Sequence, residues 1–327
     1  MGEFDLIRRF FTRPAAAPGV ALGVGDDCAL LQPTPGMQWA ISSDMLVEGR
    51  HFFAGTDPQR LGHKALAVNL SDLAACGARP RGFTLALALP EANEAWLQAF
   101  AQGLLQLADA HDCPLVGGDT TRGPLNLCVT VFGEVPTGQA LLRSGARAGD
   151  DLYVSGHLGD ARLALEALLG RLRLPQALLQ GAQQRLEQPT PRVALGLALR
   201  GIASSAIDVS DGLLGDLGHV LRASGTGATV DASIAITLIA ACADSESAKC
   251  QFDLDFLRQC ALAGGDDYEL LFTAPAALRS AVAQAAQACG TAVTRIGRIE
   301  AEPGLRLVDA LGQALDAQCY ASFDHFG

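Results

Sequence analysis

Stretches with helical spacing alternate with short apolar runs along the whole 327-residue chain, and this alternation constrains the fold more than any other feature. The interval 60–76 predicts a helix that stops at Gly77. The interval 82–90 (GFTLALALP) predicts a strand closed by its proline, and 92–111 predicts a second long helix. Alternation of this kind is typical of a mixed α/β protein.

The chain is long enough for two domains of ordinary size. Between residues 136 and 149 the sequence becomes rich in Gly, Arg and small residues. We therefore predict an N-terminal domain of residues 1–137 and a C-terminal domain of residues 138–327. The second domain is expected to open with a strand (DDLYVSG), and its helices are expected at 160–169, 175–187 and 276–288.

Composition excludes several classes of protein. The net charge is −11, whereas nucleic-acid binders normally carry a basic patch or stripe. No apolar run reaches the roughly 18 residues needed to span a bilayer, and the charged N-terminus does not resemble a signal peptide. The nine cysteines are scattered without a CxxC pair, which indicates reduced thiols. We expect a cytoplasmic protein that binds neither nucleic acid nor membrane.

Aspartates recur at turns that follow short apolar runs, and one such run is a predicted strand that ends at Asp44. Strand ends often meet at one site, where several carboxylates would repel one another unless cations lay between them. Oxygen ligands of this kind suit Mg²⁺, which combines carboxylates with water and substrate phosphates. The aspartates in question, with one near the end of a helix, are Asp26, Asp27, Asp44, Asp72, Asp119, Asp208, Asp211, Asp266 and Asp267.

Each aspartate also has a simpler local explanation. Aspartate often hydrogen-bonds its own turn, and in DVSDGL one of Asp208, Ser210 or Asp211 could cap the following helix. Glycines beside the aspartates would let backbone N–H groups approach phosphate oxygens. The chain has no GxxxxGK[ST] motif, so the sequence does not predict a P-loop.

Taken in order, the motifs resemble those of the thiamine-monophosphate kinases. The matching segments cover essentially the whole chain: GVGDDCALL, SSDMLVEGRHF, HKALAVNLSDLAACGARPRGF, VGGDTTRG, GEVP, RSGARAGDDLYVSG, DVSDGL, GGDDYELLFT and FDHF. The resemblance implies a two-domain α/β (α+β) fold shared with aminoimidazole ribonucleotide synthetase. It also implies a homodimer formed through N-terminal domains that bind ATP and Mg²⁺, with the C-terminal domain completing the active site.

The resemblance further implies transfer of the γ-phosphoryl group of ATP to thiamine monophosphate, with several Mg²⁺ ions and no phosphoenzyme. By position, the implied magnesium ligands are Asp27, Ser42, Ser43, Asp44, Asp72, Asp119, Asp208 and Asp211. Of these, Asp44, Asp72, Asp119 and Asp208 are the implied catalytic residues. The implied ATP contacts are Gly118, Arg143 and Ser210, and the implied thiamine-phosphate contacts are His51, Glu269 and Phe323.

Structural explanations remain open for four of these residues. His51 lies beside two phenylalanines, and Phe323 could belong to a terminal core. Glu269 could be a solvated glutamate at a strand edge, and Arg143 an ordinary surface charge, although a guanidinium suits forked contacts with phosphate. The family often has threonine at Ser42 and Ser43 and tryptophan at Phe323, and Arg50 replaces a small apolar residue.

Other functions compete with this interpretation. A selenophosphate synthetase would need a reactive cysteine or selenocysteine before GVGDD, and a hydrogenase-maturation dehydratase would end in a cysteine, whereas this chain ends in DHFG. The segment SSDMLVEGRHF resembles the sequence of aminoimidazole ribonucleotide synthetase less well. A non-catalytic nucleotide-binding homologue would be expected to have lost several acidic positions, and a purely structural dimer would not need them.

Overall fold

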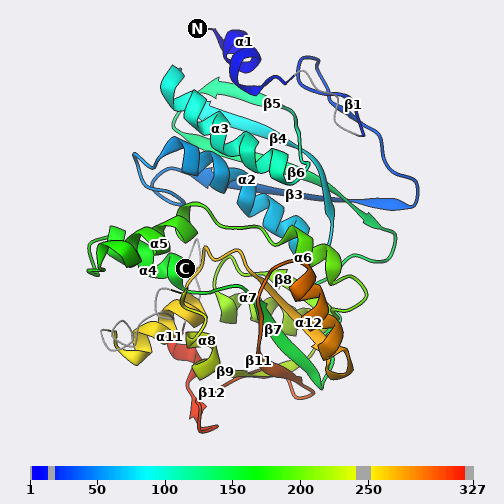
Figure 1. Cartoon of the computed structure of the whole chain (residues 1–327), viewed down its shortest axis with the longest axis vertical. Helices are drawn as coiled ribbons and strands as arrows, with labels where there is room; N and C mark the ends of the chain where they lie inside the picture. The colour runs from blue at the N-terminus through cyan, green and yellow to red at the C-terminus, as the bar shows by residue number, and fades with distance from the viewer. Residues whose placement is uncertain (1, 14–18, 241–251, 321–327) are drawn as a thin grey trace. The chain divides into compact units, whose positions relative to one another are not determined.

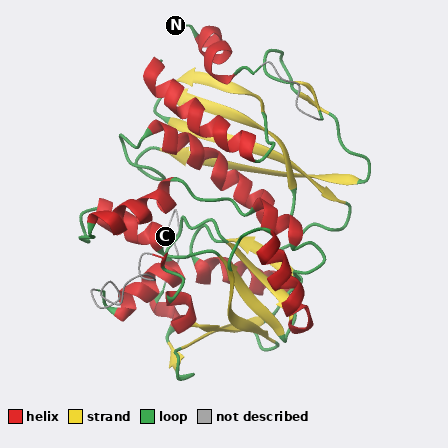
Figure 2. Ribbon diagram, viewed as in Figure 1, coloured by secondary structure: helices red, strands yellow, loops and turns green. Residues whose placement is uncertain are grey.

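The computed structural model describes residues 2–13, 19–240 and 252–320 (Figure 1). The chain divides into two compact units. The first comprises residues 1–73 and 78–140, and the second comprises residues 74–77 and 141–327. Among the described residues, no helix has the length and apolar character needed to cross a membrane. Helices and strands are interspersed in both units (Figure 2), which confirms the predicted mixed fold.

The first unit is built on a four-stranded sheet in the order β3-β6-β4-β5. Strand β6 pairs antiparallel with β3 and β4, and β5 pairs parallel with β4. The elements of this unit are α1 (Glu3–Leu6), η1 (Ile7–Phe11), β1 (Val20–Leu22), β2 (Leu30–Leu31), β3 (Met37–Val47), α2 (Pro58–Ala75), β4 (Arg79–Leu89), α3 (Glu94–Ala110), β5 (Leu115–Arg122) and β6 (Asn126–Pro136).

One face of this sheet carries the core of the first unit. Alternate residues of β4, including Phe83, Leu85 and Leu87, are buried on the side where α2 and α3 cross the sheet (Figure 1). Strict alternation places every second side chain of a strand on one face. Helix α2 ends before Gly77, whose φ of 65° gives a left-handed stop, as the sequence predicts.

The opposite face of the same sheet is exposed, and we call it the open face. On β3 it carries Met37, Trp39, Ile41, Met45 and Val47, which are 37–61% exposed. The side chains between them point to the helix-covered face, where Leu46 is buried. A row of five large apolar side chains in water is unusual for a sheet face, and exposed apolar patches often mark interaction surfaces.

The second unit contains a seven-stranded sheet in the order β13-β12-β9-β11-β7-β10-β8. All of its pairings are antiparallel except that of β12 with β9. Its elements are β7 (Asp150–Ser155), α4 (Asp160–Leu168), α5 (Gln176–Glu187), α6 (Val193–Ala198), β8 (Ser205–Asp208), α7 (Leu213–Ser224), β9 (Gly227–Asp231), α8 (Ala232–Ile236), α11 (Leu254–Ala263), β10 (Leu270–Pro275), η2 (Ala276–Leu278), α12 (Arg279–Ala288), β11 (Val293–Glu300), β12 (Gly304–Val308), β13 (Ala314–Leu315) and η3 (Ala317–Cys319).

The core of the second unit lies between this sheet and α7. Leu217 and Val220 of α7 pack in one buried cluster with Leu152 of β7 and Ile207 of β8. Burial of this kind fixes the position of the loop that joins β8 to α7. That loop carries Asp208, Ser210 and Asp211, so the core directly determines where these side chains lie.

The predicted helices are confirmed to within a few residues, but two strand boundaries are not. The strand expected to end at Asp44 continues to Val47, and Asp119 lies inside β5 rather than in a turn after it. Both strands are prolonged by pairing: β3 pairs with the eleven-residue β6 over its whole length, and β5 pairs with β4 as far as Arg122. The final helix also begins later than expected, at Arg279, after a short 3-10 turn.

Candidate functional site

Two acidic residues of the first unit, Asp44 and Asp72, come from β3 and α2. Ser42 and Asp44 are two residues apart on β3, so both side chains point toward the helix-covered face. The Ser42 hydroxyl donates a hydrogen bond to Asp72 Oδ2 of α2 at 2.5 Å. Of the predicted metal ligands in this unit, the structure therefore brings Ser42, Asp44 and Asp72 to one region.

Asn69 connects the same two elements, and sequence reasoning did not select it. Its Oδ1 accepts a hydrogen bond from the Asp44 backbone N–H at 3.1 Å, while its Nδ2 donates to the Ala65 carbonyl at 3.0 Å. The residue is buried and lies one turn before Asp72 on α2. On the predicted helix, Asn69 and Asp72 are three residues apart and so lie on the same face, and this spacing could have identified Asn69 from the sequence.

His51 lies in the turn that follows β3. Its Nδ1 accepts a hydrogen bond from the Val47 backbone N–H at 3.0 Å, and its own N–H donates to the Val47 carbonyl. Because Nδ1 is an acceptor, the neutral ring carries its proton on Nε2. The turn thus fixes the ring and gives it a donor for an anionic partner.

Asp119 does not join Asp44 within one chain. The sheet register aligns Asp44, Val129, Leu85 and Gly118 in a single row, one residue before Asp119. Three strand spacings correspond to about 14 Å between the outer strands. Asp119 pairs with Ala86, whose side chain is on the open face, whereas Asp44 points to the other face.

Ser43 and Asp27 are the remaining predicted ligands of this unit. Ser43 is on the open face, where its hydroxyl lies 2.9 Å from Thr130 Oγ1 and donates to the Val129 carbonyl. Asp27 is exposed in the segment between β1 and β2, and its N–H donates to Asp26 Oδ1. The metal-ligand roles of Ser43 and Asp27 remain predictions.

In the second unit, one carboxylate organises the DVSDG loop. Asp216 Oδ2 accepts hydrogen bonds from the backbone N–H groups of Ser210, Asp211 and Gly212, at 3.0, 3.1 and 3.2 Å. Asp216 is buried in the first turns of α7. Sequence reasoning missed it, although it stands only five residues after Asp211, within reach of the loop.

The negative charge in this loop is poorly compensated. Burial, followed by repulsion from Asp211, raises the pKa of Asp216 to about 7, although the three N–H donors oppose the shift. Helix α7 begins after Gly212 and has no side-chain cap, so neither Ser210 nor Asp211 serves as a helix cap. The capping explanation for these residues is therefore wrong.

The GGDD segment packs along the same loop. Asp266 N–H donates to the Ser210 carbonyl at 2.9 Å, and Tyr268 N–H donates to the Val209 carbonyl at 2.8 Å. Asp266 and Tyr268 have φ values of 65° and 51°, which are rare for residues other than glycine and often occur at functional sites. Asp267 is half-buried as a residue, but enclosure of its carboxylate raises its pKa.

Glu269 is buried rather than solvated, so the surface explanation for it is wrong. Its carboxylate accepts hydrogen bonds from Arg192 at 2.5 and 2.6 Å, from the Ser155 hydroxyl at 2.6 Å and from the His157 N–H at 3.3 Å. It precedes β10, which lies between β7 and β8 and is not an edge strand. Its contact with substrate remains a prediction.

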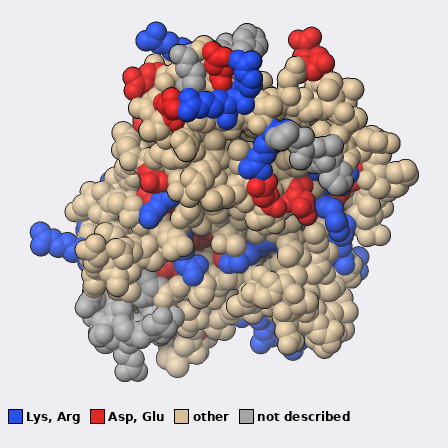
Figure 3. Space-filling model, turned by 45° about the horizontal axis from the view of Figure 1, so that its top comes forward, with Lys and Arg blue, Asp and Glu red and all other residues tan. Residues whose placement is uncertain are grey.

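Arg143 is exposed near the C-terminal end of α7, where its carbonyl accepts a hydrogen bond from the Ser224 hydroxyl. The pKa of His219 is lowered by burial, by Arg222 and by Arg143, and raised by Asp211. Arg143 and Asp211 therefore both lie within electrostatic range of His219. On the face shown in Figure 3, basic and acidic side chains are interspersed. Phe323 lies outside the described residues.

The described residues include oxygen ligands that fit magnesium chemistry. Within the described part of the chain, no group of three or more Asp, Glu, His or Cys residues is arranged to hold a metal. Each unit instead offers hard oxygen donors, namely Ser42, Asp44 and Asp72 in the first and Asp208 and Asp211 in the second. Mg²⁺ usually takes one or two carboxylates and completes its shell with water and substrate phosphate.

Comparison with protein families defines the class. Residues 25–135 match the model for the N-terminal domain of AIR synthase related proteins, and residues 147–310 match that for the C-terminal domain. A thiamine-monophosphate kinase from Salmonella typhimurium is 46% identical over 99% of this chain and 98% of its own length. The chain belongs to the thiamine-monophosphate kinase family.

Solved structures agree with this assignment. The crystal structure of a thiamine-monophosphate kinase from Stenotrophomonas maltophilia K279a has a TM-score of 0.82 at 48% identity, covering 91% of this chain and 93% of that chain. A structure of AaThiL complexed with AMPPCP and TMP has a TM-score of 0.72 at 27% identity, covering 99% of this chain and 96% of that chain.

Proposed function

We infer that this enzyme transfers the γ-phosphoryl group of ATP to thiamine monophosphate, giving thiamine diphosphate and ADP. The observation that carries the inference is near-full-length similarity to thiamine-monophosphate kinases, at 46% identity. A structural neighbour holds AMPPCP, an ATP analogue, together with TMP. The acceptor is already an anionic phosphate oxygen, so the reaction needs no strong general base. Positioning and charge neutralisation supply most of the rate.

In the first unit, Asp44 and Asp72 are the residues that hold divalent cations. Magnesium bound at these carboxylates would neutralise charge on the phosphates during transfer. Ser42 orients Asp72 through its hydrogen bond, and Asn69 fixes the backbone of Asp44. The His51 ring, held through Nδ1, presents Nε2–H to the phosphate of the acceptor.

In the second unit, Asp208 and Asp211 are the corresponding cation ligands, and the Ser210 hydroxyl contacts ATP. Asp216 holds the loop that carries all three. The Arg143 guanidinium donates two hydrogen bonds to phosphate oxygens of ATP, because its forked N–H groups match the spacing of those oxygens. Glu269 shapes the acceptor pocket together with Arg192, and Phe323 supplies an aromatic surface to the thiamine group.

The enzyme works as a homodimer, and a second copy covers the open face of the first unit. Five large apolar side chains of β3 are exposed there, and β3 is an edge strand of its sheet. A long edge strand with exposed apolar side chains would otherwise tend to aggregate with other chains. Sedimentation of the wild type and of Ile41→Asp tests this, and a monomeric wild type would refute it.

The dimer also explains why Asp119 lies far from Asp44 in one chain. The two residues are on opposite faces and about 14 Å apart across the sheet. In the dimer, Asp119 on the open face of one copy meets Asp44 of the other copy at the β3 edge of its sheet. The site is then incomplete in a monomer.

The reaction takes place in the cytoplasm, where ATP is abundant and thiols stay reduced. The seven cysteines within the described ranges are all free of disulfides. These observations support the location but do not bear on the chemistry.

The test is formation of thiamine diphosphate from purified protein, ATP and thiamine monophosphate, with and without Mg²⁺. We expect magnesium-dependent product and no reaction with free thiamine. Absence of product would refute the substrate assignment. If ATP were still bound, other phosphorylated acceptors would be tried next, and failure of all of them would favour a non-catalytic nucleotide-binding homologue.

A further inference from the structure

Two segments that carry the family resemblance, GEVP and ARPRGF, contribute no residue to the predicted sites. Each supplies one side chain to an ion pair in the first unit, in which Arg81 Nε of β4 lies 3.4 Å from Glu134 Oε2 of β6. Glu134 is buried. A buried carboxylate loses its hydration and needs hydrogen-bond partners or a counter-charge. The partners of Glu134 and Arg81 therefore indicate what the pair does.

Glu134 binds one end of the segment that carries Asp27. Its Oε1 accepts a hydrogen bond from the Thr34 backbone N–H at 2.8 Å, and its Oε2 accepts one from the Thr34 hydroxyl at 2.8 Å. Thr34 ends the segment of residues 19–34, in which β1 pairs with β2, and we call this segment the Asp27 arm. Hydrogen bonds to an ionised carboxylate are about twice as strong as those between neutral groups.

Arg81 contacts the other end of the Asp27 arm. The register of β4 with β6 shifts between Pro80 and Gly82, so Arg81 is the extra residue of a bulge, and bulges often redirect a side chain. Its guanidinium lies against Gly19, where a Cβ would be 2.1 Å from Arg81 Nη2. The Gly19 carbonyl accepts the Gln32 N–H at 2.7 Å, which joins the two ends of the arm. The ion pair therefore contacts both ends.

The Asp27 arm has little else to hold it in place. All of its residues are described, and none of them is buried. Its large apolar side chains Leu22 and Leu30 are 37% and 55% exposed. Segments with few buried apolar contacts open at a low cost in free energy. The contacts made by Arg81 and Glu134 therefore largely determine where the arm lies.

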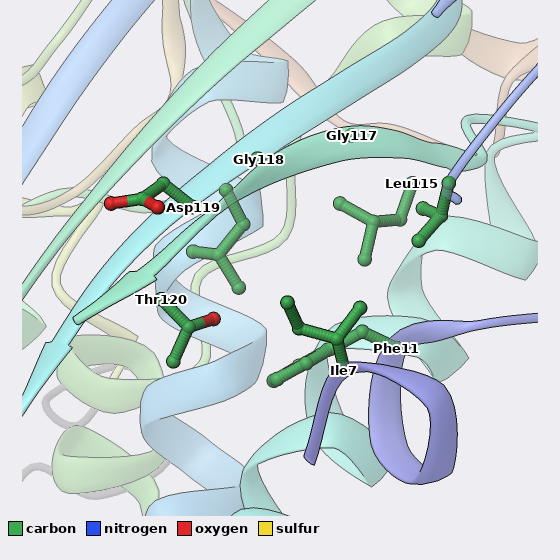
Figure 4. A pocket seen from close by; sticks show the side chains of 9 residues that line it. Ile7, Phe11, Leu115, Gly117, Gly118, Asp119 and Thr120 are labelled. Atoms are coloured by element: carbon green, nitrogen blue, oxygen red, sulfur yellow. The ribbon is translucent and has the colours of Figure 1, made fainter. Parts of the chain in front are cut away.

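The position of the arm matters because it runs beside the strand that carries Asp119. Val24 of the arm lines one pocket together with Gly118 and Asp119 of β5 (Figure 4). Asp27 follows Val24 by three residues. The arm thus brings one predicted magnesium ligand close along the chain to a residue that lies beside another.

We propose that Arg81 and Glu134 form a clasp that positions Asp27 for cation binding, which makes Glu134 a positioning residue for phosphoryl transfer. The inference rests on the proposed function and on the predicted ligand role of Asp27. An arm held in place beforehand spares ligand binding the cost of ordering it. An arm in place only about one tenth of the time would raise the apparent Kd about tenfold.

The first measurement is hydrogen exchange of the backbone amides of residues 19–34 without ligand. We expect exchange about tenfold faster in Glu134→Ala, as for loss of a hydrogen bond to a charged group, and a smaller change in Glu134→Gln, which keeps an acceptor oxygen for Thr34. The matched control is Glu166→Ala, because Glu166 is also buried and lies 2.9 Å from Arg162, but in the second unit. It should leave exchange in the arm unchanged. Wild-type exchange in Glu134→Ala would overturn the clasp.

Folding and assembly of the variants are checked separately. Thermal unfolding identifies any variant that fails to fold. Sedimentation shows whether assembly is retained, because Glu134 pairs in register with Trp39, which is on the open face. Glu134→Gln, which alters the side chain least, is used for the binding measurement if Glu134→Ala fails either check.

The second measurement is calorimetric binding of AMPPCP in Mg²⁺ to Glu134→Ala, Asp27→Asn and the double variant. We expect each single variant to bind about tenfold more weakly and the double variant to bind no more weakly than Asp27→Asn, because Glu134 acts through Asp27. Additive losses, or wild-type affinity in Glu134→Ala, would overturn the positioning role. Absence of AMPPCP binding by the wild type would instead refute the proposed function, and the exchange measurement would still decide whether the clasp exists.

Discussion

The Ser42 hydroxyl donates to Asp72 Oδ2 at 2.5 Å, so a residue of β3 holds a carboxylate that belongs to α2. Ser42 thereby acts on the orientation of Asp72 as well as offering its own oxygen. The bond links β3 and α2, the two elements that carry Asp44 and Asp72.

Removal of this hydroxyl should reduce activity without unfolding the protein. In Ser42→Ala, Asp72 loses the hydrogen bond that Ser42 donates, and misplacement of a positioning group of this kind can lower the rate by about 100-fold. Ser42→Thr keeps the hydroxyl and should retain most activity. The measurement is kcat for thiamine diphosphate formation across a series of Mg²⁺ concentrations. Equal activity of the Ala and Thr variants would exclude a role for the hydroxyl.

Asp44 and Asp119 provide a test of the shared dimer site. Asp44→Asn and Asp119→Asn should each be inactive as homodimers. In a mixed dimer, one of the two sites then carries both substitutions and the other carries neither. Random mixing of equal amounts should therefore restore about one quarter of wild-type activity.

The control for this experiment is a mixture of Asp44→Asn with Asp72→Asn, which lie together in the first unit and should not complement. The chains are co-expressed with different affinity tags, and the mixed dimers are isolated and assayed. Each isolated mixed dimer keeps one intact site of two, so it should show about half of wild-type activity. If Asp44 and Asp119 act within one chain, each site of every mixed dimer is damaged, and no activity returns.

Much of the fold was predictable because it follows from local patterns. The helix expected at 60–76 is α2, from Pro58 to Ala75, and its stop at Gly77 comes from glycine's tolerance of a left-handed φ. The ends of β3 were not predictable in the same way. They are set by pairing with β6, about ninety residues away, and local sequence carries little information about a partner so distant.

The site was predictable as a set of residue types but not as an arrangement. Ser42 and Ser43 look equivalent in the sequence, yet the two-residue period of β3 sends their side chains to opposite faces. Asn69 and Asp216 act through backbone N–H groups of loops and strands, and such bonds leave no residue-type signature. Glu269 appeared solvated because its partner, Arg192, comes from a remote segment.

Asp216 should affect both the stability of the protein and its binding of ATP, although we assign it no contact with a substrate. Asp216→Ala leaves three backbone donors of the DVSDG loop without their acceptor, and each buried unsatisfied donor costs about 1–3 kcal/mol. We expect a lower free energy of unfolding and a raised KM for ATP. Asp216→Asn keeps an acceptor oxygen and should be milder. Glu302→Ala, at an exposed ion pair with Arg306, is the control and should change neither quantity. A wild-type KM for ATP in Asp216→Ala would contradict this role.

Glu269 and Arg192 should behave as a coupled pair. Glu269→Gln leaves a partly buried guanidinium without its charge partner, which typically costs about 3–5 kcal/mol. If Glu269 also contacts the acceptor, KM for thiamine monophosphate should rise more in Glu269→Gln than in Arg192→Met. Chemical denaturation and steady-state kinetics on both variants measure these effects. The same KM increase in both would show that Glu269 only positions its neighbours.

Asp151 should make stability depend on pH. The hydrogen bonds and charges of Arg279 and Arg295 lower the pKa of this buried carboxyl, although burial opposes them. Because the folded pKa lies below the unfolded one, the stabilisation is present above the unfolded pKa, near 4, and is lost as pH falls through the folded value.

Asp151→Asn should therefore lower the free energy of unfolding by about 1–3 kcal/mol at pH 7, as expected for loss of a charged hydrogen-bond acceptor. The difference from the wild type should shrink as pH falls below about 4, because the wild-type carboxyl then becomes neutral too. Urea unfolding at a series of pH values measures both effects. Glu302→Gln, at an exposed ion pair with Arg306, should match the wild type throughout. A constant difference between Asp151→Asn and wild type across this range would mean that packing, rather than charge, explains the loss.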